Sequence, residues 1–187
     1  MNIFEKAMKE QARGNYTKCE ALLLDYLKNN PDDSEALLNL GMYYFNVEEF
    51  SNSIKILEKC AELHPDYCDA YIGLGLSYEK SGLQLKAIEV LEIAINLEPD
   101  NYKALNNLGA VYAGIGEFQK SIELLLKATK IAPDEHGILI TLARVYLNSG
   151  DFIKAAELYQ QVKRSTKVYH FKVLAKEGLA EIKKLNK

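Results

Sequence analysis

The chain has 187 residues, of which 48% are hydrophobic and 26% charged, and its net charge is −3 at pH 7. This composition is typical of globular proteins and excludes wholesale disorder and collagen-like or mucin-like chains. The small net charge gives no general attraction to nucleic acid, so we expect none as a partner. No apolar run approaches the roughly 18 residues of a membrane span, so we expect no direct membrane insertion. The N-terminus has no signal-peptide pattern, and the three cysteines have no framework spacing, which predicts a cytoplasmic protein.

The charge is unevenly distributed along the chain. Residues 1–30 carry a net charge of +1, residues 31–98 of −9, residues 99–166 of +1 and residues 167–187 of +4. An acidic middle and a basic tail favour a partner with basic flanks, or head-to-tail association of copies of this chain.

A repeat organises the sequence. Its four prolines, Pro31, Pro65, Pro99 and Pro133, are 34 residues apart, and each is followed by aspartate. With position 1 set at Ser34, Cys68, Tyr102 and His136, the four segments align without a gap. Position 11 is always tyrosine, position 7 is always leucine, and position 8 is glycine three times and then alanine.

Each repeat predicts two amphipathic helices. Positions 4, 7, 8 and 11 lie on one stripe of a first helix, and positions 20, 24 and 27 lie on one stripe of a second. Small residues at positions 8, 20 and 27 allow the two helices to approach closely. Glycine between the two stripes ends the first helix, and the proline at position 32 ends the second.

This pattern resembles the tetratricopeptide repeat, a family with a 34-residue period. The resemblance implies an all-α, right-handed α-solenoid of helix-turn-helix units at 34–67, 68–101, 102–135 and 136–167, within one domain spanning 1–187. Residues 1–33 fit as a degenerate first repeat, in which Lys6 and Glu10 occupy the apolar positions 7 and 11. In the last unit Lys167 replaces proline, so we expect its second helix to run on toward the tail.

The tail, 168–187, predicts a basic amphipathic helix. Its apolar face consists of Phe171, Leu174, Ala175, Gly178, Leu179, Ile182 and Leu185. We expect this helix to cover the apolar end of the last repeat. The alternative is that it docks against another copy of the chain.

We find no set of residues typical of catalysis and predict that the chain is not an enzyme and needs no cofactor. The strongest metal candidate combines Cys60, His64 and Cys68. Because Cys60 lies at the small core position 27, we expect it to pack as a small hydrophobic residue and predict no metal site.

We expect the functional surface on the side of the first helix that lies opposite the core. In tetratricopeptide proteins this side lines a concave groove for peptides or partner helices, and here much of it is apolar. The expected groove residues are Leu38, Asn39, Met42, Phe45, Ile72, Leu76, Glu79, Lys103, Asn106, Asn107, Ala110, Ile140, Arg144 and Leu147. The alternative is that these side chains only pad one first helix against the next.

The resemblance therefore implies a non-catalytic scaffold or adaptor that binds a peptide or amphipathic helix of a partner protein. The lysine and asparagine pattern with which some family members clamp a C-terminal carboxylate is incomplete here. One alternative function is self-assembly into a homo-oligomer through the groove and the terminal helix. Another is an accessory subunit that recruits an enzyme.

Overall fold

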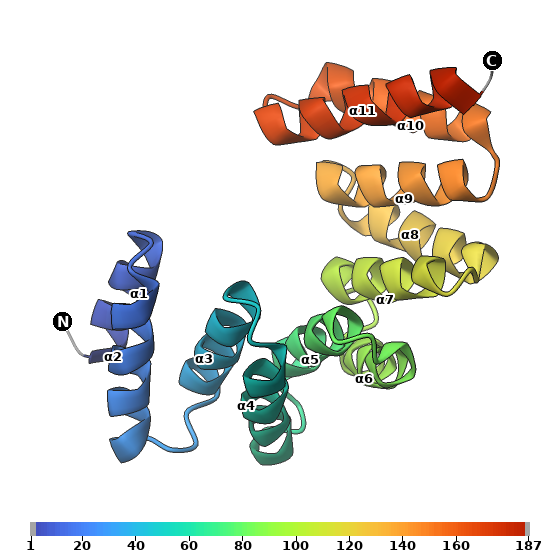
Figure 1. Cartoon of the computed structure of the whole chain (residues 1–187). Helices are drawn as coiled ribbons and strands as arrows, with labels where there is room; N and C mark the ends of the chain where they lie inside the picture. Colours follow the sequence, from blue (N-terminus) through green and yellow to red (C-terminus); the bar gives the residue numbers. More distant parts are fainter. Residues whose placement is uncertain (1–2, 186–187) are drawn as a thin grey trace. The chain divides into compact units, whose positions relative to one another are not determined.

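The computed structural model describes residues 3–185, which form eleven α-helices and no strand (Figure 1). The helices form two compact units, Met1–Glu98 (unit 1) and Pro99–Lys187 (unit 2). Residues 1–2 and 186–187 of the predicted terminal segments lie outside the described residues. The predicted all-α fold of paired helices is confirmed, whereas the single domain stays a prediction.

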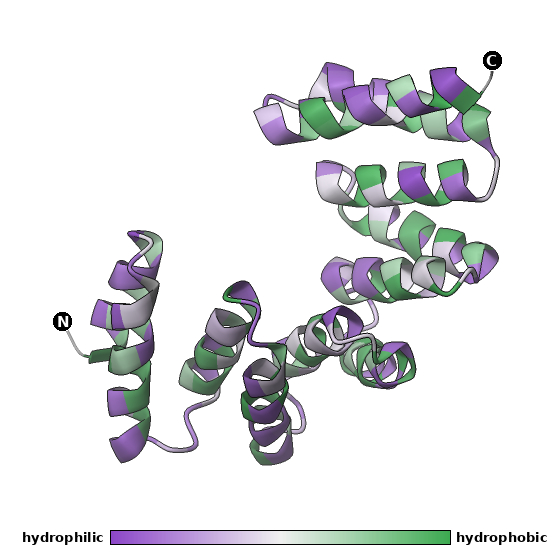
Figure 2. Ribbon diagram, viewed as in Figure 1, coloured by the Kyte–Doolittle hydropathy of each residue, from purple (hydrophilic) through white to green (hydrophobic). Residues whose placement is uncertain are grey.

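Unit 1 contains three helix pairs. These are α1 (Ile3–Ala12) with α2 (Tyr16–Asn29), α3 (Ser34–Asn46) with α4 (Phe50–Leu63), and α5 (Cys68–Lys80) with α6 (Gln84–Leu97). Unit 2 contains α7 (Tyr102–Gly114) with α8 (Phe118–Ile131), α9 (His136–Asn148) with α10 (Phe152–Ser165), and α11 (Tyr169–Leu185). Each 34-residue segment of the sequence thus contains one pair of helices. Hydrophobic and hydrophilic residues alternate along the helices, as the amphipathic pattern predicts (Figure 2).

In three pairs a glycine of the first helix lies directly against a leucine of the second: Gly41 with Leu57, Gly75 with Leu91 and Gly109 with Leu125. A Cβ atom placed on Gly41 or Gly75 would lie 2.5 Å from Cγ of Leu57 or Leu91. Non-bonded carbon atoms prefer separations of about 3.5–4.0 Å, so no side chain fits at these positions unless the leucine moves. The small residue at position 8 is therefore a requirement of the contact between the two helices.

The turn inside each pair depends on a backbone conformation that favours glycine. Gly14, Gly82, Gly116 and Gly150 have φ angles of 76°, 75°, 83° and 87°. Glu48 occupies the same place in the α3–α4 turn with a φ of 63°. Glycine adopts this left-handed region without the steric cost that a Cβ atom brings.

Polar side chains cap the N-termini of several first helices. Asp33 accepts a hydrogen bond from the Ala36 backbone N–H at 2.8 Å, and Asn101 accepts one from that of Ala104 at 3.1 Å. Glu135 accepts one from the Gly137 N–H at 3.3 Å. Such caps satisfy N–H groups that have no partner within the helix.

The second helix of the last repeat does not run on toward the tail, contrary to the prediction made from Lys167. α10 ends at Ser165, the position at which α4, α6 and α8 also end. Thr166 has an extended backbone with ψ 140°, and its Oγ1 accepts a hydrogen bond from the Val168 N–H at 3.1 Å. The buried Thr166 side chain ends the helix without a proline.

The terminal helix α11 packs on α10 and α9 within unit 2. It buries Ala175, Gly178 and Ile182. A Cβ atom on Gly178 would lie 2.3 Å from the ring of Tyr159, so the glycine allows close packing on α10. Lys176 and Lys183 are exposed on α11. The helix therefore covers the last repeat of its own chain.

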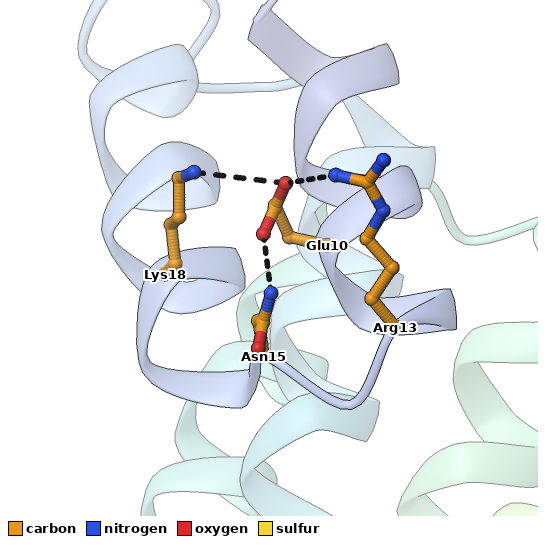
Figure 3. Close-up of polar contacts among 4 residues, drawn as sticks. All are labelled: Glu10, Arg13, Asn15 and Lys18. Carbon is orange, nitrogen blue, oxygen red and sulfur yellow. Dashed lines mark hydrogen bonds and ion pairs between the residues drawn. The ribbon is translucent and has the colours of Figure 1, made fainter.

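The degenerate first repeat places a carboxylate where the other repeats have tyrosine. Glu10 is only 7% exposed, and Asn15 Nδ2 donates to its Oε2 at 2.7 Å (Figure 3). Arg13 Nη1 lies 3.0 Å and Lys18 Nζ 3.6 Å from its Oε1. The Asn15 hydrogen bond, followed by the Lys18 and Arg13 charges, lowers the pKa of Glu10. These partners stabilise a buried charge at an otherwise apolar position.

We predict opposite effects for two glycine substitutions. Gly75→Ala forces a Cβ atom into Leu91 and should lower the free energy of unfolding by about 1–3 kcal/mol. Gly114→Ala is the matched control, because no atom lies within 4 Å of its added Cβ. It should raise the free energy of unfolding by about 0.5 kcal/mol through helix propensity. Chemical denaturation of the full chain measures both, and equal effects would contradict the close-contact account.

The Glu10 contacts predict a pH dependence of the first helix pair. Because the pKa of Glu10 is lowered in the folded protein, its contribution to stability is present above the unfolded pKa, about 4.3. The contribution is lost as the pH falls through the lower folded pKa. Glu10→Gln should therefore accelerate hydrogen exchange of the α1 backbone amides at neutral pH, and this effect should shrink as the pH falls below about 4.3. Glu62→Gln, an exposed carboxylate on α4, is the control; a Glu10→Gln effect independent of pH would contradict the prediction.

Candidate functional site

The predicted groove residues of unit 1 lie on α3 and α5. Six of the seven are half-buried: Leu38, Asn39, Met42, Phe45, Leu76 and Glu79. The seventh, Ile72, is only 7% exposed. Six predicted residues of this unit therefore keep surface that a partner can reach.

Neighbouring helices cover part of this surface. Met42 Sδ lies 3.2 Å from the place of a Cβ atom on Gly73, so Met42 of α3 packs against α5. The rings of Phe45 and Phe50 are 5.7 Å apart. These side chains therefore contribute to packing between helices and also keep accessible area.

Two further apolar residues on α1 were missed in the sequence. Phe4 and Met8 occupy positions 5 and 9 of the degenerate repeat, the positions of Leu38 and Met42 in the next one. Both are half-buried and pack against the cluster of Ala7, Cys19, Leu23, Leu40 and Tyr43. The helical register of residues 3–12 could have identified these two residues. Lys6 and Glu10 obscured it, because they occupy positions that are apolar in the other repeats.

We call the side of α1, α3 and α5 that carries positions 5, 9 and 12 the first-helix face of unit 1. Its half-buried apolar residues form what we call the apolar row: Phe4, Met8, Leu38, Met42, Phe45 and Leu76. Phe4 and Met8 of α1 contact the cluster that contains Leu40 and Tyr43 of α3, and Met42 of α3 contacts α5.

The predicted residues of unit 2 form a different surface. On α7, Lys103 is exposed, whereas Asn106, Asn107 and Ala110 are half-buried. On α9, Arg144 is exposed, whereas Ile140 and Leu147 are only 6% and 7% exposed. The accessible part of this set is thus polar or small.

The predicted asparagines form local hydrogen bonds. Asn39 Nδ2 donates to the Glu35 carbonyl of its own helix at 2.7 Å. Asn106 Nδ2 donates to Asn107 Oδ1 at 3.3 Å. These contacts use one donor each of Asn39 and Asn106 and the Oδ1 atom of Asn107, whereas the buried Asn106 Oδ1 has no hydrogen-bond partner among the described residues.

The two units carry opposite net charges. Unit 1 contains 17 acidic and 9 basic residues, and unit 2 contains 9 acidic and 14 basic residues. In unit 1 the inter-repeat loops expose Asp32 and Asp66, and α5 exposes Asp69 near its start. The field around unit 1 therefore attracts cations.

The repeated spacing of tyrosine and lysine has a structural role. Lys86, Lys120 and Lys154 at position 19 lie over the rings of Tyr78, Tyr112 and Tyr146 at position 11, with Nζ 5.3, 5.3 and 5.0 Å from the ring centroids. Such cation–π contacts link the first helix of each pair to the second.

Three tyrosine hydroxyls, including that of Tyr78, donate hydrogen bonds to carboxylates. Glu20 accepts hydrogen bonds from the Tyr43 and Tyr44 hydroxyls at 3.1 and 2.9 Å, and Glu58 accepts one from Tyr78. Burial, followed by the Glu20 hydrogen bond, raises the pKa of Tyr44 to about 12. These phenols remain protonated and act in packing.

The side chains of the metal candidate have separate partners. Cys60 Sγ donates to the Ser34 carbonyl and Cys68 Sγ to the Ala94 carbonyl, each at 3.5 Å. His64 Nε2 makes a hydrogen bond with the Asp32 carbonyl. Between residues 3 and 185, no three His, Cys, Asp or Glu side chains are grouped so that they could hold a metal ion.

Over the same range, no helix combines the length and apolar character needed to cross a membrane.

Three parts of the chain match repeat families. Residues 34–67 and 72–136 each match a tetratricopeptide repeat family, and residues 113–166 match the family described as YpiA-like, tetratricopeptide repeats. No protein of curated function matches the sequence significantly.

Solved structures with the same fold cover nearly the whole chain. TTC0263, a thermophilic TPR protein in Thermus thermophilus, has a TM-score of 0.83 and 24% identity, with 95% of this chain and 97% of that chain covered. MamA has a TM-score of 0.72 and 26% identity, with 89% and 94% covered. YrrB, a TPR protein with an unusual peptide-binding site, has a TM-score of 0.68 and 16% identity, with 94% and 90% covered. These likenesses confirm the predicted fold class of helix-turn-helix repeats.

The geometry around Cys60 predicts an unreactive thiol. Burial, followed by the negative charge of Asp33, raises the pKa of Cys60 to about 11. At pH 8 its thiolate fraction should be about a hundredfold below that of an unburied cysteine. Iodoacetamide labelling followed by peptide mass spectrometry should show Cys60 unmodified in the folded protein and modified in guanidinium chloride. Similar rates in both states, or zinc retained through dialysis, would contradict this assignment.

Proposed function

The chain belongs to the tetratricopeptide repeat family, and we propose that it is a non-catalytic scaffold that binds a segment of a partner protein. The first-helix face of unit 1 is the proposed site, and its occupant is a peptide or an amphipathic helix. YrrB, which shares the fold, is described as having an unusual peptide-binding site, which supports the proposal at the level of the fold.

The observation that carries the proposal is the apolar row. Its residues lie beside the stripe of each first helix that packs on the second, and they keep accessible surface on α1, α3 and α5. Accessible apolar side chains of this kind gain free energy when a partner covers them. Methionine and phenylalanine suit such a role because they adapt to an inserted side chain and bury large areas.

Packing of one first helix against the next accounts for only part of the predicted groove residues. Ile72, Ile140 and Leu147 are buried, as padding requires. Leu38 and Leu76 are half-buried, so packing inside unit 1 does not use their whole surface. These two leucines are therefore the residues to test, since their substitution perturbs the core less than substitution of Ile72.

Self-assembly through the terminal helix is the competing function. In unit 2 the apolar face of α11 packs on α10, and Ala175, Gly178 and Ile182 are buried there. Docking of this face against another copy would require α11 to leave its own unit. This cost favours a separate partner protein over the tail of a second copy.

The proposal predicts that aspartate on the first-helix face abolishes partner capture. Tagged full-length protein carrying Leu38→Asp and Leu76→Asp should lose proteins that the wild type retains from a lysate of the source cell, because a buried carboxylate opposes apolar contact. Leu85→Asp is the matched control, because Leu85 lies on α6 of the same unit and is 81% exposed. Affinity for a retained protein should fall at least tenfold, about 1.4 kcal/mol. Equal retention by all three proteins would refute the proposal.

A further inference from the structure

We propose that the occupant of this face is a cationic amphipathic helix, and that the degenerate first repeat forms part of its binding site through Phe4 and Met8. This inference rests on the proposed function and deepens it. It assigns the partner a chemical class and adds α1 to the site.

The register of α1 places Phe4 and Met8 on the first-helix face. Ala7 at position 8 is fully buried, like Gly41 at position 8 of α3. Positions 5 and 9 lie about 60° and 100° around the helix from this contact, so Phe4 and Met8 have the register of Leu38 and Met42. The Phe4 ring also lies 5.5 Å from the ring of Tyr26 on α2, and the Phe4 and Met8 side chains are both half-buried. α1 therefore extends the apolar row.

The two irregular residues of α1 do not disturb this face. Lys6 is exposed, and Glu10 is held by Asn15, Arg13 and Lys18 on the side of α2 (Figure 3). Glu10 thus alters the contacts of the first helix with α2, whereas Phe4 and Met8 are apolar like the residues at the same positions of α3 and α5.

The polar groups of the face favour a helix over an extended peptide. An extended chain brings unpaired backbone N–H and C=O groups that the site must satisfy. Asn39, the amide among the predicted residues of α3, already donates to Glu35 of its own helix. A helix has its backbone groups paired internally and contributes mainly apolar side chains, which is what the apolar row can bind.

Charge selects a cationic helix. Unit 1 carries 17 acidic and 9 basic residues, and half-buried Glu79 at position 12 of α5 lies on the first-helix face itself. Glu35 on α3 and Asp69 on α5 are exposed in the first turns of their helices. Lysine or arginine along the flanks of a bound helix would face these carboxylates, whereas acidic flanks would be repelled.

Synthetic peptides of about 18 residues test the inference with the full-length protein. One is an amphipathic helix of leucine and lysine, the second replaces lysine by glutamate, and the third is a scrambled leucine–lysine sequence without an apolar face. Only the first should bind tightly, and its affinity should fall as salt is added. Equal binding of the glutamate peptide or of the scrambled peptide would overturn the inference.

Methionine methyl NMR locates the bound peptide without a destabilising substitution. The protein has three methionines, and Met8 and Met42 both belong to the apolar row. Addition of the leucine–lysine helix to protein labelled with ¹³C at the methionine methyl groups should shift both signals, assigned through Met8→Leu and Met42→Leu. A shift of Met42 without Met8 would overturn the role of α1 and leave the proposed function intact.

A paired variant measures the contribution of α1. Phe4→Gln with Met8→Gln should weaken binding of the leucine–lysine helix at least tenfold, whereas Leu85→Gln should not change it. Unchanged binding by the double variant would overturn the inference. Absence of binding by the wild type would also overturn it, and the proposed function would then be judged by the Leu38→Asp, Leu76→Asp capture experiment alone.

Discussion

The close contact between a small residue at position 8 and the side chain at position 24, which is glycine against leucine in three helix pairs, constrains the rest of the structure. At Gly41 and Gly75 the distance to Leu57 and Leu91 leaves no room for a Cβ atom. This contact fixes which side of the first helix meets the second, and thereby which side is left for other uses. The first-helix face is a consequence, because positions 5, 9 and 12 lie beside the core stripe and keep accessible surface, although Phe4 and Phe45 also contact the second helix of their own pair.

The ends of the chain show how the repeat is closed. At the N-terminal end Glu10 with Lys18 occupies positions 11 and 19, where three later repeats place lysine over a tyrosine ring. At the C-terminal end α11 covers α10 and has Gly178 seated on Tyr159. α11 thus covers the apolar end of unit 2, whereas the apolar row of unit 1 keeps accessible surface.

Much of the fold follows from local rules visible in the sequence. The 34-residue spacing of proline and the turn glycines predict where the helices begin and end, since both residues act through backbone geometry alone. The end of α10 was mispredicted because Thr166 stops the helix through tertiary burial and a side-chain hydrogen bond, which no local pattern encodes. The site was less predictable, because burial of Ile72, Ile140 and Leu147 depends on neighbouring helices, and Phe4 and Met8 were hidden by irregular positions beside them.

Site-specific photo-crosslinking in the source cell tests the central claim most directly. A photoreactive phenylalanine analogue at Leu38 should crosslink a partner protein, and the crosslinked segment should be a helix rich in lysine or arginine. The same analogue at Leu85, which is 81% exposed in the same unit, should not capture that partner. Crosslinking of the same partner from Leu85, or the lack of any partner at Leu38, would contradict the account of the first-helix face as the recognition surface.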